Sequence, residues 1–192
     1  MQTASFNLAD THADWTLFLD RDGVLNHEKN NDYILHPGEF HLYDGVPEAM
    51  RLLSGLFKRI IVTTNQKGVG KGLMTLQDLH DIHAYMQQQL TAAGGRIDHI
   101  FYCTDLADDS PNRKPNPGMA FQAREQYPDI HLAESLMVGN RPSDMAFGRN
   151  AGMHTVYLAT THPETPFPHP DIDLRFSSLL DFAQAVEAIR KA

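Results

Sequence analysis

The feature that most constrains this chain is an apolar run, residues 17–19, that leads into two carboxylates and a glycine. The run predicts a strand buried on both faces, as at the centre of a parallel sheet. In open α/β sheets, ligands bind just beyond the carboxyl ends of the strands. Asp20 and Asp22 are therefore expected at that edge, where Gly23 lets the backbone turn away. Two such carboxylates repel each other unless a cation lies between them or one takes up a proton.

Strands and helices alternate along most of the chain. Strands are predicted at residues 15–19, 59–64, 99–103, 136–138 and 155–158. Apolar residues at helical spacing lie between and after these strands, with expected N-terminal capping residues at Asp44, at Thr75 with Asp78, and at Ser178. This alternation predicts an α/β fold with a Rossmann-like central parallel sheet and helices on both faces.

Two segments lie outside the alternation. Residues 27–43 are polar and interrupted by Pro37 and Gly38. A loop of that length in a compact domain usually serves function, so we expect it to overhang the paired aspartates. Residues 1–13 show no periodicity and are expected to be a loose lead-in. With no second hydrophobic core and no large cap domain in sight, residues 1–192 are predicted to form one domain.

Composition argues against several classes of function. The formal net charge of −8 disfavours nucleic acid as a general partner. Cys103 is the only cysteine, which excludes an intrachain disulfide framework and a multi-cysteine zinc site. No apolar run approaches the roughly 20 residues of a membrane span. Residues 1–14 are polar, without a basic start or an apolar stretch, so no secretory signal is expected there. We expect a cytoplasmic, monomeric protein that acts on a small molecule, with no membrane partner.

The segment Asp20-Arg21-Asp22-Gly23 after an apolar strand resembles the first motif of the haloacid dehalogenase (HAD) superfamily of phosphohydrolases. Its continuation, Val-Leu-Asn, is similar to the narrower group of small, capless sugar-bisphosphate and histidinol-phosphate phosphatases. Asp-x-Asp-Gly also occurs in turns and calcium loops, so the later motifs must decide between these interpretations.

Two later segments resemble further motifs of the superfamily, each after a predicted strand. Thr64 and Asn65 match the second motif, and Gln66 beside them is typical of the capless group. Taken alone, threonine in a strand and asparagine in the following turn are ordinary. Lys114, preceded by Arg113 and followed by Pro-Asn-Pro-Gly, matches the third motif. Most lysines are simply solvated on the surface, but this combination is uncommon at the start of a helix.

The segment Gly-Asn-Arg-Pro-Ser-Asp that begins at Gly139 resembles the fourth motif with one departure. Asn140 stands where the family usually has a metal-binding aspartate, whereas the second acid, Asp144, is present. A second departure concerns zinc, because the loop before Arg113 keeps only Cys103 of the cysteines and histidine that such phosphatases commonly carry. One thiol cannot make a tetrahedral zinc site, so no zinc is expected.

The resemblance implies a Mg²⁺-dependent phosphatase that forms an aspartyl-phosphate. Asp20 would be the nucleophile, ionised at neutral pH because a carboxyl of this type has a reference pKa of about 3.9. Asp22 would protonate the leaving oxygen and then activate water. Thr64 and Lys114 would hold the phosphoryl oxygens and complete the catalytic set.

The remaining roles implied by the resemblance concern substrate and metal. Asn65, Gln66 and Arg113 would bind substrate. The metal would be held by Asp20, the backbone carbonyl of Asp22, and Asn140, with Asp144 as a further candidate.

Within the family, the motifs are most similar to those of heptose 1,7-bisphosphate phosphatases, with histidinol-phosphate phosphatases as a near alternative. Nucleic-acid 3′-phosphatases share the motifs but act on a partner that the acidic charge disfavours. A non-catalytic binding protein of the same fold is a further alternative, suggested by Asn140 alone.

Overall fold

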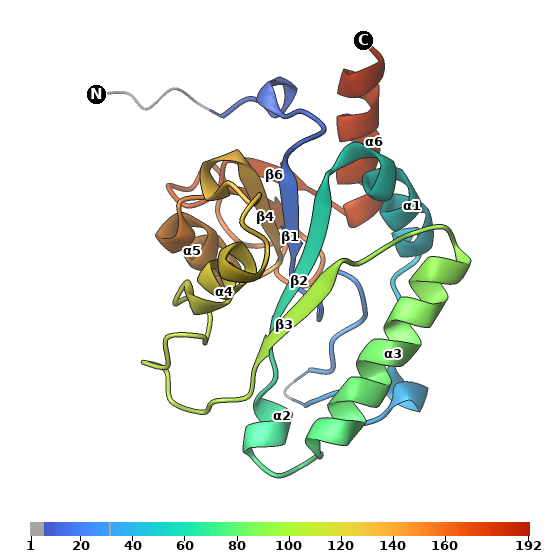
Figure 1. The fold of residues 1–192 in the computed structure, drawn as a ribbon, viewed down its shortest axis with the longest axis vertical. Helices are drawn as coiled ribbons and strands as arrows, with labels where there is room; N and C mark the ends of the chain where they lie inside the picture. The colour runs from blue at the N-terminus through green and yellow to red at the C-terminus, as the bar shows by residue number, and fades with distance from the viewer. Residues whose placement is uncertain (1–5, 31) are drawn as a thin grey trace.

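The computed structural model describes residues 6–30 and 32–192. The described residues form one sheet of six parallel strands in the order β3-β2-β1-β4-β5-β6 (Figure 1). The strands are β1 (Thr16–Leu19), β2 (Arg59–Asn65), β3 (His99–Cys103), β4 (Ser135–Gly139), β5 (His154–Leu158) and β6 (Leu174–Phe176). The predicted parallel sheet with the first strand at its centre is confirmed. The short β6 at the edge was not predicted from the sequence.

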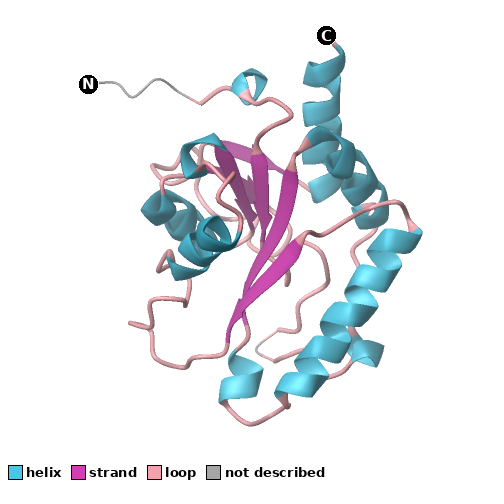
Figure 2. Ribbon diagram, viewed as in Figure 1, coloured by secondary structure: helices cyan, strands magenta, loops and turns pink. Residues whose placement is uncertain are grey.

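Helices cover both faces of this sheet, as predicted (Figure 2). On one face lie α1 (Val46–Leu56), α3 (Leu76–Ala92) and α6 (Leu179–Lys191). On the other lie α4 (Gly118–Gln126) and α5 (Pro142–Ala151). Short helical turns complete the chain: α2 (Lys67–Gly70), η1 (Leu8–Asp10), η2 (Pro37–Glu39) and η3 (Leu132–Glu134). Among the described residues, no helix has both the length and the apolar character that crossing a bilayer requires.

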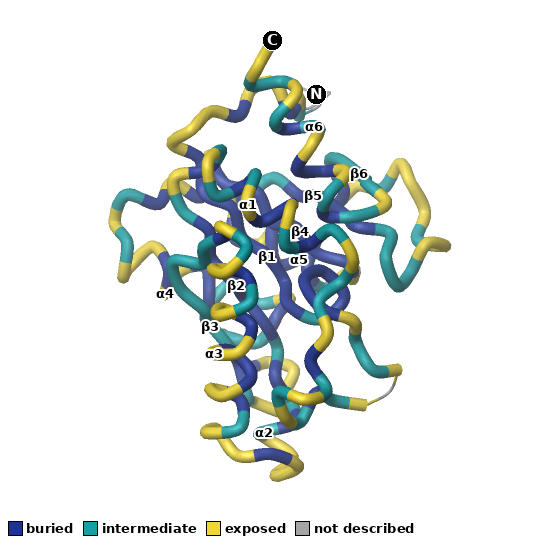
Figure 3. Tube along the Cα trace, turned by 90° about the vertical axis from the view of Figure 1, so that its right-hand side faces the viewer, coloured by how far each residue is buried: buried dark blue, intermediate teal, exposed yellow. Residues whose placement is uncertain are grey.

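The central strands are buried (Figure 3), and their side chains alternate between two cores. Leu17 and Leu19 of β1 pack into the core under α1, α3 and α6, whereas Phe18 packs into the core under α4 and α5. Phe18 is in register with Ile61 of β2 and Met137 of β4, and both belong to the same core as Phe18. The period of two along a strand thus assigns each apolar residue to a core.

The predicted helix starts were right at two positions and wrong at one. Thr75 and Asp78 form a reciprocal capping box, and the Ser178 hydroxyl accepts the N–H of Asp181. Asp44 does not cap α1, whose N-cap is Gly45, with φ of 80°. A Cβ at Gly45 would lie 2.9 Å from the Leu180 side chain. Packing of α6 against this turn, together with the left-handed backbone, therefore places the helix start one residue later than the sequence suggested.

The N-terminal segment was expected to be loose. Residues 1–5 lie outside the described residues. In the part that is described, Leu8 and Thr11 are buried and the ring of Phe6 stacks on His154 at 4.1 Å. Residues 6–13 therefore pack against the domain through apolar contacts that periodicity could not reveal, and the expectation was wrong for this stretch.

Candidate active site

The sequence motifs converge at the carboxyl ends of the central strands. Asp20 follows β1, Thr64 lies at the end of β2, and Asn140 follows β4. The chain runs from β1 outward to β3 and then returns to the other side of β1 as β4, so β1 and β4 flank the topological switch point of the sheet. Open α/β sheets bind ligands at such a point. A cavity of about 320 Å³ opens there.

A buried lysine joins two carboxylates at the base of this cavity. The Lys114 Nζ lies 2.8 Å from Oδ1 of Asp20 and 2.7 Å from Oδ1 of Asp144, and it donates to the Thr63 carbonyl at 2.9 Å. All three charged side chains are at most 9% exposed. Burial alone would lower the pKa of Lys114, but the two carboxylates raise it above its usual value, so the ammonium stays charged.

The two carboxylates carry more negative charge than the single ammonium of Lys114 can offset, and burial together with this excess raises the pKa of Asp20. Burial, followed by the negative charge of Asp144, raises the pKa of Asp20 to about 7, although Lys114 acts in the opposite direction. In the metal-free protein the neutral form of Asp20 is therefore favoured far more than it would be for an exposed carboxyl. The expectation of an ionised Asp20 rested on the reference pKa of an exposed carboxyl, and the metal-free cavity does not provide that environment.

Asp22, in contrast to Asp20, is held in its ionised form by three donors. Its Oδ1 accepts from Arg21 at 3.0 Å and from Asn26 at 2.9 Å, and its Oδ2 lies 2.9 Å from Arg21 and 3.0 Å from Nε2 of Gln66. Burial pushes the pKa of Asp22 upward, but the Arg21 charge and the hydrogen bonds from Asn26 and Gln66 hold it below its usual value. The Asp22 side chain remains about a quarter exposed, so it can meet a ligand.

Two residues assigned to substrate from the sequence make their contacts within the protein. The Asn65 side chain exchanges two 3.0 Å hydrogen bonds with the backbone of Lys114, which fixes the loop that carries the lysine. Gln66 bonds both Asp22 and the Thr64 hydroxyl, the latter at 2.9 Å. Both residues line the cavity, but their side chains first serve to hold Lys114, Asp22 and Thr64 in place.

Charged residues surround the cavity mouth. Arg113 lines it and lies 3.2 Å from the exposed Asp108, while Arg141 pairs with Glu28 at 2.9 Å. Glu28, Lys29, Asp32, Tyr33 and Ile34 of the long loop line the same cavity, so the loop overhangs the site as predicted. The rim of the cavity therefore carries two arginine side chains, Arg113 and Arg141, whose acidic partners are at least partly exposed to solvent.

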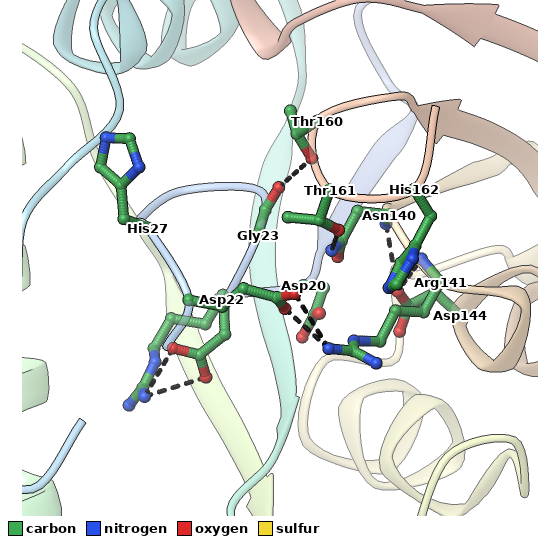
Figure 4. A network of polar contacts seen from close by, with 12 residues as sticks. Asp20, Asp22, Gly23, His27, Asn140, Arg141, Asp144, Thr160, Thr161 and His162 are labelled. Carbon is green, nitrogen blue, oxygen red and sulfur yellow. Dashed lines mark hydrogen bonds and ion pairs between the residues drawn. The ribbon is translucent and has the colours of Figure 1, made fainter. Parts of the chain in front are cut away.

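Asn140 has an atom suited to a metal. Its Nδ2 donates to the Thr161 hydroxyl at 2.7 Å (Figure 4). Its Oδ1 is buried and, among the described residues, accepts no hydrogen bond. A buried carbonyl oxygen without a donor fits a hard cation such as Mg²⁺. Both oxygens of Asp144 are engaged, Oδ1 by Lys114 and Oδ2 by the backbone N–H groups of Asn140 and Arg141, so Asp144 fits a supporting position better.

The donor set decides which kind of cation could bind. No three His, Cys, Asp or Glu side chains of the described residues are grouped as metal ligands. A cation at Asp20 and Asn140 would therefore complete its shell with backbone, substrate or water oxygens, as Mg²⁺ commonly does. Gly23 makes room for this arrangement, because a Cβ there would lie 2.0 Å from Nδ2 of Asn140.

Sequence reasoning missed several residues of the site. Arg21 and Asn26 stand inside the first motif, and that position was the available signal. Thr160 and Thr161 come from the proline-rich loop after β5; Thr160 donates to the Gly23 carbonyl (Figure 4). Their sequence context gives no indication of this contact.

Comparison with known proteins agrees with this geometry. An HAD-hydrolase-like family model matches residues 111–165. A D-glycero-alpha-D-manno-heptose-1,7-bisphosphate 7-phosphatase of Mycobacterium bovis is 34% identical over 173 residues, covering 90% of this chain and 91% of that protein. The corresponding beta enzyme of Escherichia coli O6:H1 is 33% identical over 184 residues, covering 91% and 95%.

Solved structures of similar proteins have the same fold. The D,D-heptose 1,7-bisphosphate phosphatase of B. bronchiseptica, complexed with magnesium and phosphate, superposes with a TM-score of 0.81 at 27% identity over 93% of this chain and 99% of that one. The enzyme from Burkholderia thailandensis gives 0.66 at 27% identity over 91% and 99%. This chain therefore belongs to the heptose-1,7-bisphosphate phosphatase family of HAD-type phosphoric monoester hydrolases.

Proposed function

We propose that this chain is a Mg²⁺-dependent phosphatase that removes one phosphate from a heptose 1,7-bisphosphate through an aspartyl-phosphate on Asp20. The observation that carries the proposal is the buried cluster of Asp20, Lys114 and Asp144 at the switch point, beside the exposed edge of Asp22. The names of the relatives support the substrate. A protein that only bound a partner would have no use for a nucleophile and an acid–base group in one cavity.

In this mechanism Asp20 attacks phosphorus, and Lys114 and Thr64 hold the phosphoryl oxygens as charge develops on them. Asp22 gives a proton to the leaving sugar oxygen and later takes one from the water that hydrolyses the intermediate. Asp22 is ionised in the free protein, which suits the second step. It would take up a proton as the anionic substrate enters, because a neighbouring negative charge raises the pKa of a carboxyl.

Magnesium would be held by Asp20, the Asp22 carbonyl and Oδ1 of Asn140, and when bound it would offset negative charge on Asp20 and on the phosphoryl oxygens. The free Oδ1 and the raised pKa of Asp20 both support a cation at this position. Asn140 is neutral where the family usually has a carboxylate, so metal affinity in the free protein should be low and should rise when phosphate adds oxygens.

The second phosphate of a bisphosphate would lie at the cavity rim, against Arg113 and the overhanging loop. Arg141 offers a further guanidinium there. The carboxylates that these arginines now contact, Asp108 and Glu28, would give way to the phosphate. Arg pairs with phosphate as a two-pronged donor, so the rim suits an anion more than an uncharged group.

A panel of phosphate esters tests this function. It contains both anomers of heptose 1,7-bisphosphate, histidinol phosphate, simple sugar monophosphates and 3′-phosphorylated DNA, each with Mg²⁺. We expect the bisphosphate to lose one phosphate only, and Asp20→Asn to abolish turnover while remaining folded. Equal rates on all small esters would indicate a nonspecific phosphatase. Normal phosphate release by the Asp20→Asn variant would refute the mechanism in which Asp20 attacks phosphorus.

The same assay determines which anomer of the substrate is preferred, since relatives of similar identity are named for the alpha and the beta substrate. We also propose that the protein is a cytoplasmic monomer. Sedimentation of the purified protein tests the oligomeric state, and fractionation of the source cells tests the location.

A further inference from the structure

Arg21 is a buried cation that the mechanism above leaves without a task. It is 1% exposed and ranks among the largest fully buried side chains of the described residues. A buried guanidinium is costly unless it is paired. Nη2 pairs with both oxygens of Asp22 at 3.0 and 2.9 Å, and Nη1 lies 3.3 Å from Nε2 of His83. Both terminal nitrogens are thus committed within the protein.

His83 lies on α3 and is 5% exposed. Burial, reinforced by the Arg21 charge, lowers its pKa to about 3, so the ring is neutral and its Nε2 can accept the Arg21 N–H. Helix α3 therefore supports the guanidinium through Nη1, while the other terminal nitrogen, Nη2, contacts Asp22. The chain of contacts runs from α3 through His83 and Arg21 to the carboxylate.

We propose that Arg21 is the positioning residue for Asp22, and that it fixes the carboxyl group where it must meet the leaving-group oxygen and then the hydrolytic water. This inference rests on the proposed function. Asn26 and Gln66 each touch one oxygen of Asp22, whereas Arg21 contacts both. Nη2 of Arg21 therefore bridges the two oxygens of the carboxylate, whereas each amide holds only one of them.

Comparing two substrates with different leaving groups distinguishes the positioning of Asp22 from other roles of Arg21. A sugar oxygen must be protonated as it leaves, but nitrophenolate leaves without a proton, so p-nitrophenyl phosphate bypasses the acid step. The ratio kcat/KM covers only the steps up to phosphoryl transfer. If Arg21 positions Asp22, kcat/KM should therefore depend on Arg21 for the sugar ester and not for the aryl ester. The constant kcat is less suitable, because it also includes hydrolysis of the intermediate, in which Asp22 acts as a base.

For Arg21→Met we expect kcat/KM on heptose bisphosphate to fall roughly 10- to 100-fold, the loss that misplacement by about 1 Å can cause. On p-nitrophenyl phosphate it should change less than about threefold, because no acid is required. For Asp22→Asn the sugar ester should lose roughly 10²- to 10⁴-fold. Adding Arg21→Met to Asp22→Asn should then cost less than about twofold more, since residues that act as a unit are not additive.

Arg21→Lys keeps the charge with fewer directed donors, and it serves if the methionine variant does not fold. It should show the same contrast between the two esters with a smaller loss. Arg59→Met is the matched control: it removes an Arg–Asp pair, to Asp129 at 2.9 Å, at the opposite end of β2, and both esters should react as in the parent. Thermal unfolding of each variant monitors the fold.

Equal losses of kcat/KM on the two esters, or an undiminished effect of Arg21→Met in the Asp22→Asn background, would overturn the positioning role and place Arg21 in phosphate binding or in folding. A parent protein that hydrolyses neither ester would instead refute the proposed function. The two failures are thus distinguishable.

Discussion

Replacing the nucleophile Asp20 by asparagine should stabilise the metal-free protein, although it abolishes activity. The cavity base buries two carboxylates, Asp20 and Asp144, around one ammonium, that of Lys114. Asp20→Asn removes the excess negative charge and leaves a balanced pair of Lys114 and Asp144. The asparagine Oδ1 can still accept from Nζ, so the hydrogen bond of Asp20 is kept.

The pKa of Asp20 gives the magnitude and the sign. It is about 7 in the folded chain against a reference value of 3.8, so between these values the folded state binds more protons than the unfolded state. The free energy of unfolding of the parent therefore falls as pH rises through this window, and the full penalty is present above pH 7. At about 1.36 kcal/mol for each pKa unit, the penalty is at most roughly 4 kcal/mol.

Urea unfolding in EDTA measures the effect. We expect Asp20→Asn to raise the free energy of unfolding at pH 8 by up to about 4 kcal/mol, and the gain to shrink by roughly 2–3 kcal/mol at pH 5. Saturating Mg²⁺ should narrow the difference, because it stabilises only the state that binds it and the variant lacks the carboxylate ligand. An asparagine variant less stable than the parent at pH 8 in EDTA would refute the reasoning, since the Asp20–Lys114 pair would then be net stabilising.

Three further predictions concern the metal and the turn beside it. Asn140→Asp should lower the Mg²⁺ concentration for half-maximal rate by restoring a carboxylate ligand; an equal or higher requirement would show that Asn140 is not a ligand. The purified protein should lack stoichiometric zinc by elemental analysis, and a chelator should stop turnover without unfolding it; one zinc per chain would contradict this. Gly23→Ala should destabilise by more than the roughly 1–2 kcal/mol of a left-handed alanine, because its Cβ would meet Asn140. Gly152→Ala, with a similar φ of 84° but open space, is its control in thermal unfolding, and equal losses in the two variants would contradict the close contact.

Much of the fold was predictable because it depends on local patterns. Residues 17–19 are apolar on both faces of a strand, and only a central position in a parallel sheet buries both. The order of strands and helices, the capping box at Thr75 and the convergence of Asp20, Thr64 and Asn140 at one edge follow from periodicity and topology. The sequence also indicated the chemistry through its resemblance to the four HAD motifs, which implied phosphoryl transfer by paired aspartates, a lysine and hydroxyls after successive strands.

The tertiary structure decided what these residues can do. Asn65 and Gln66 were assigned to substrate, and that assignment stays a prediction; the fold also brings Lys114 and Asp22 within reach of their amides, which hold those two residues in place. Asp20 and Asp22 have nearly the same sequence environment, yet one has its pKa raised and the other lowered. The difference comes from burial beside Asp144 in one case and from the Arg21 guanidinium in the other. Ionisation depends on charge and water within a few ångströms, and only the folded chain determines which groups, distant in sequence, come that close.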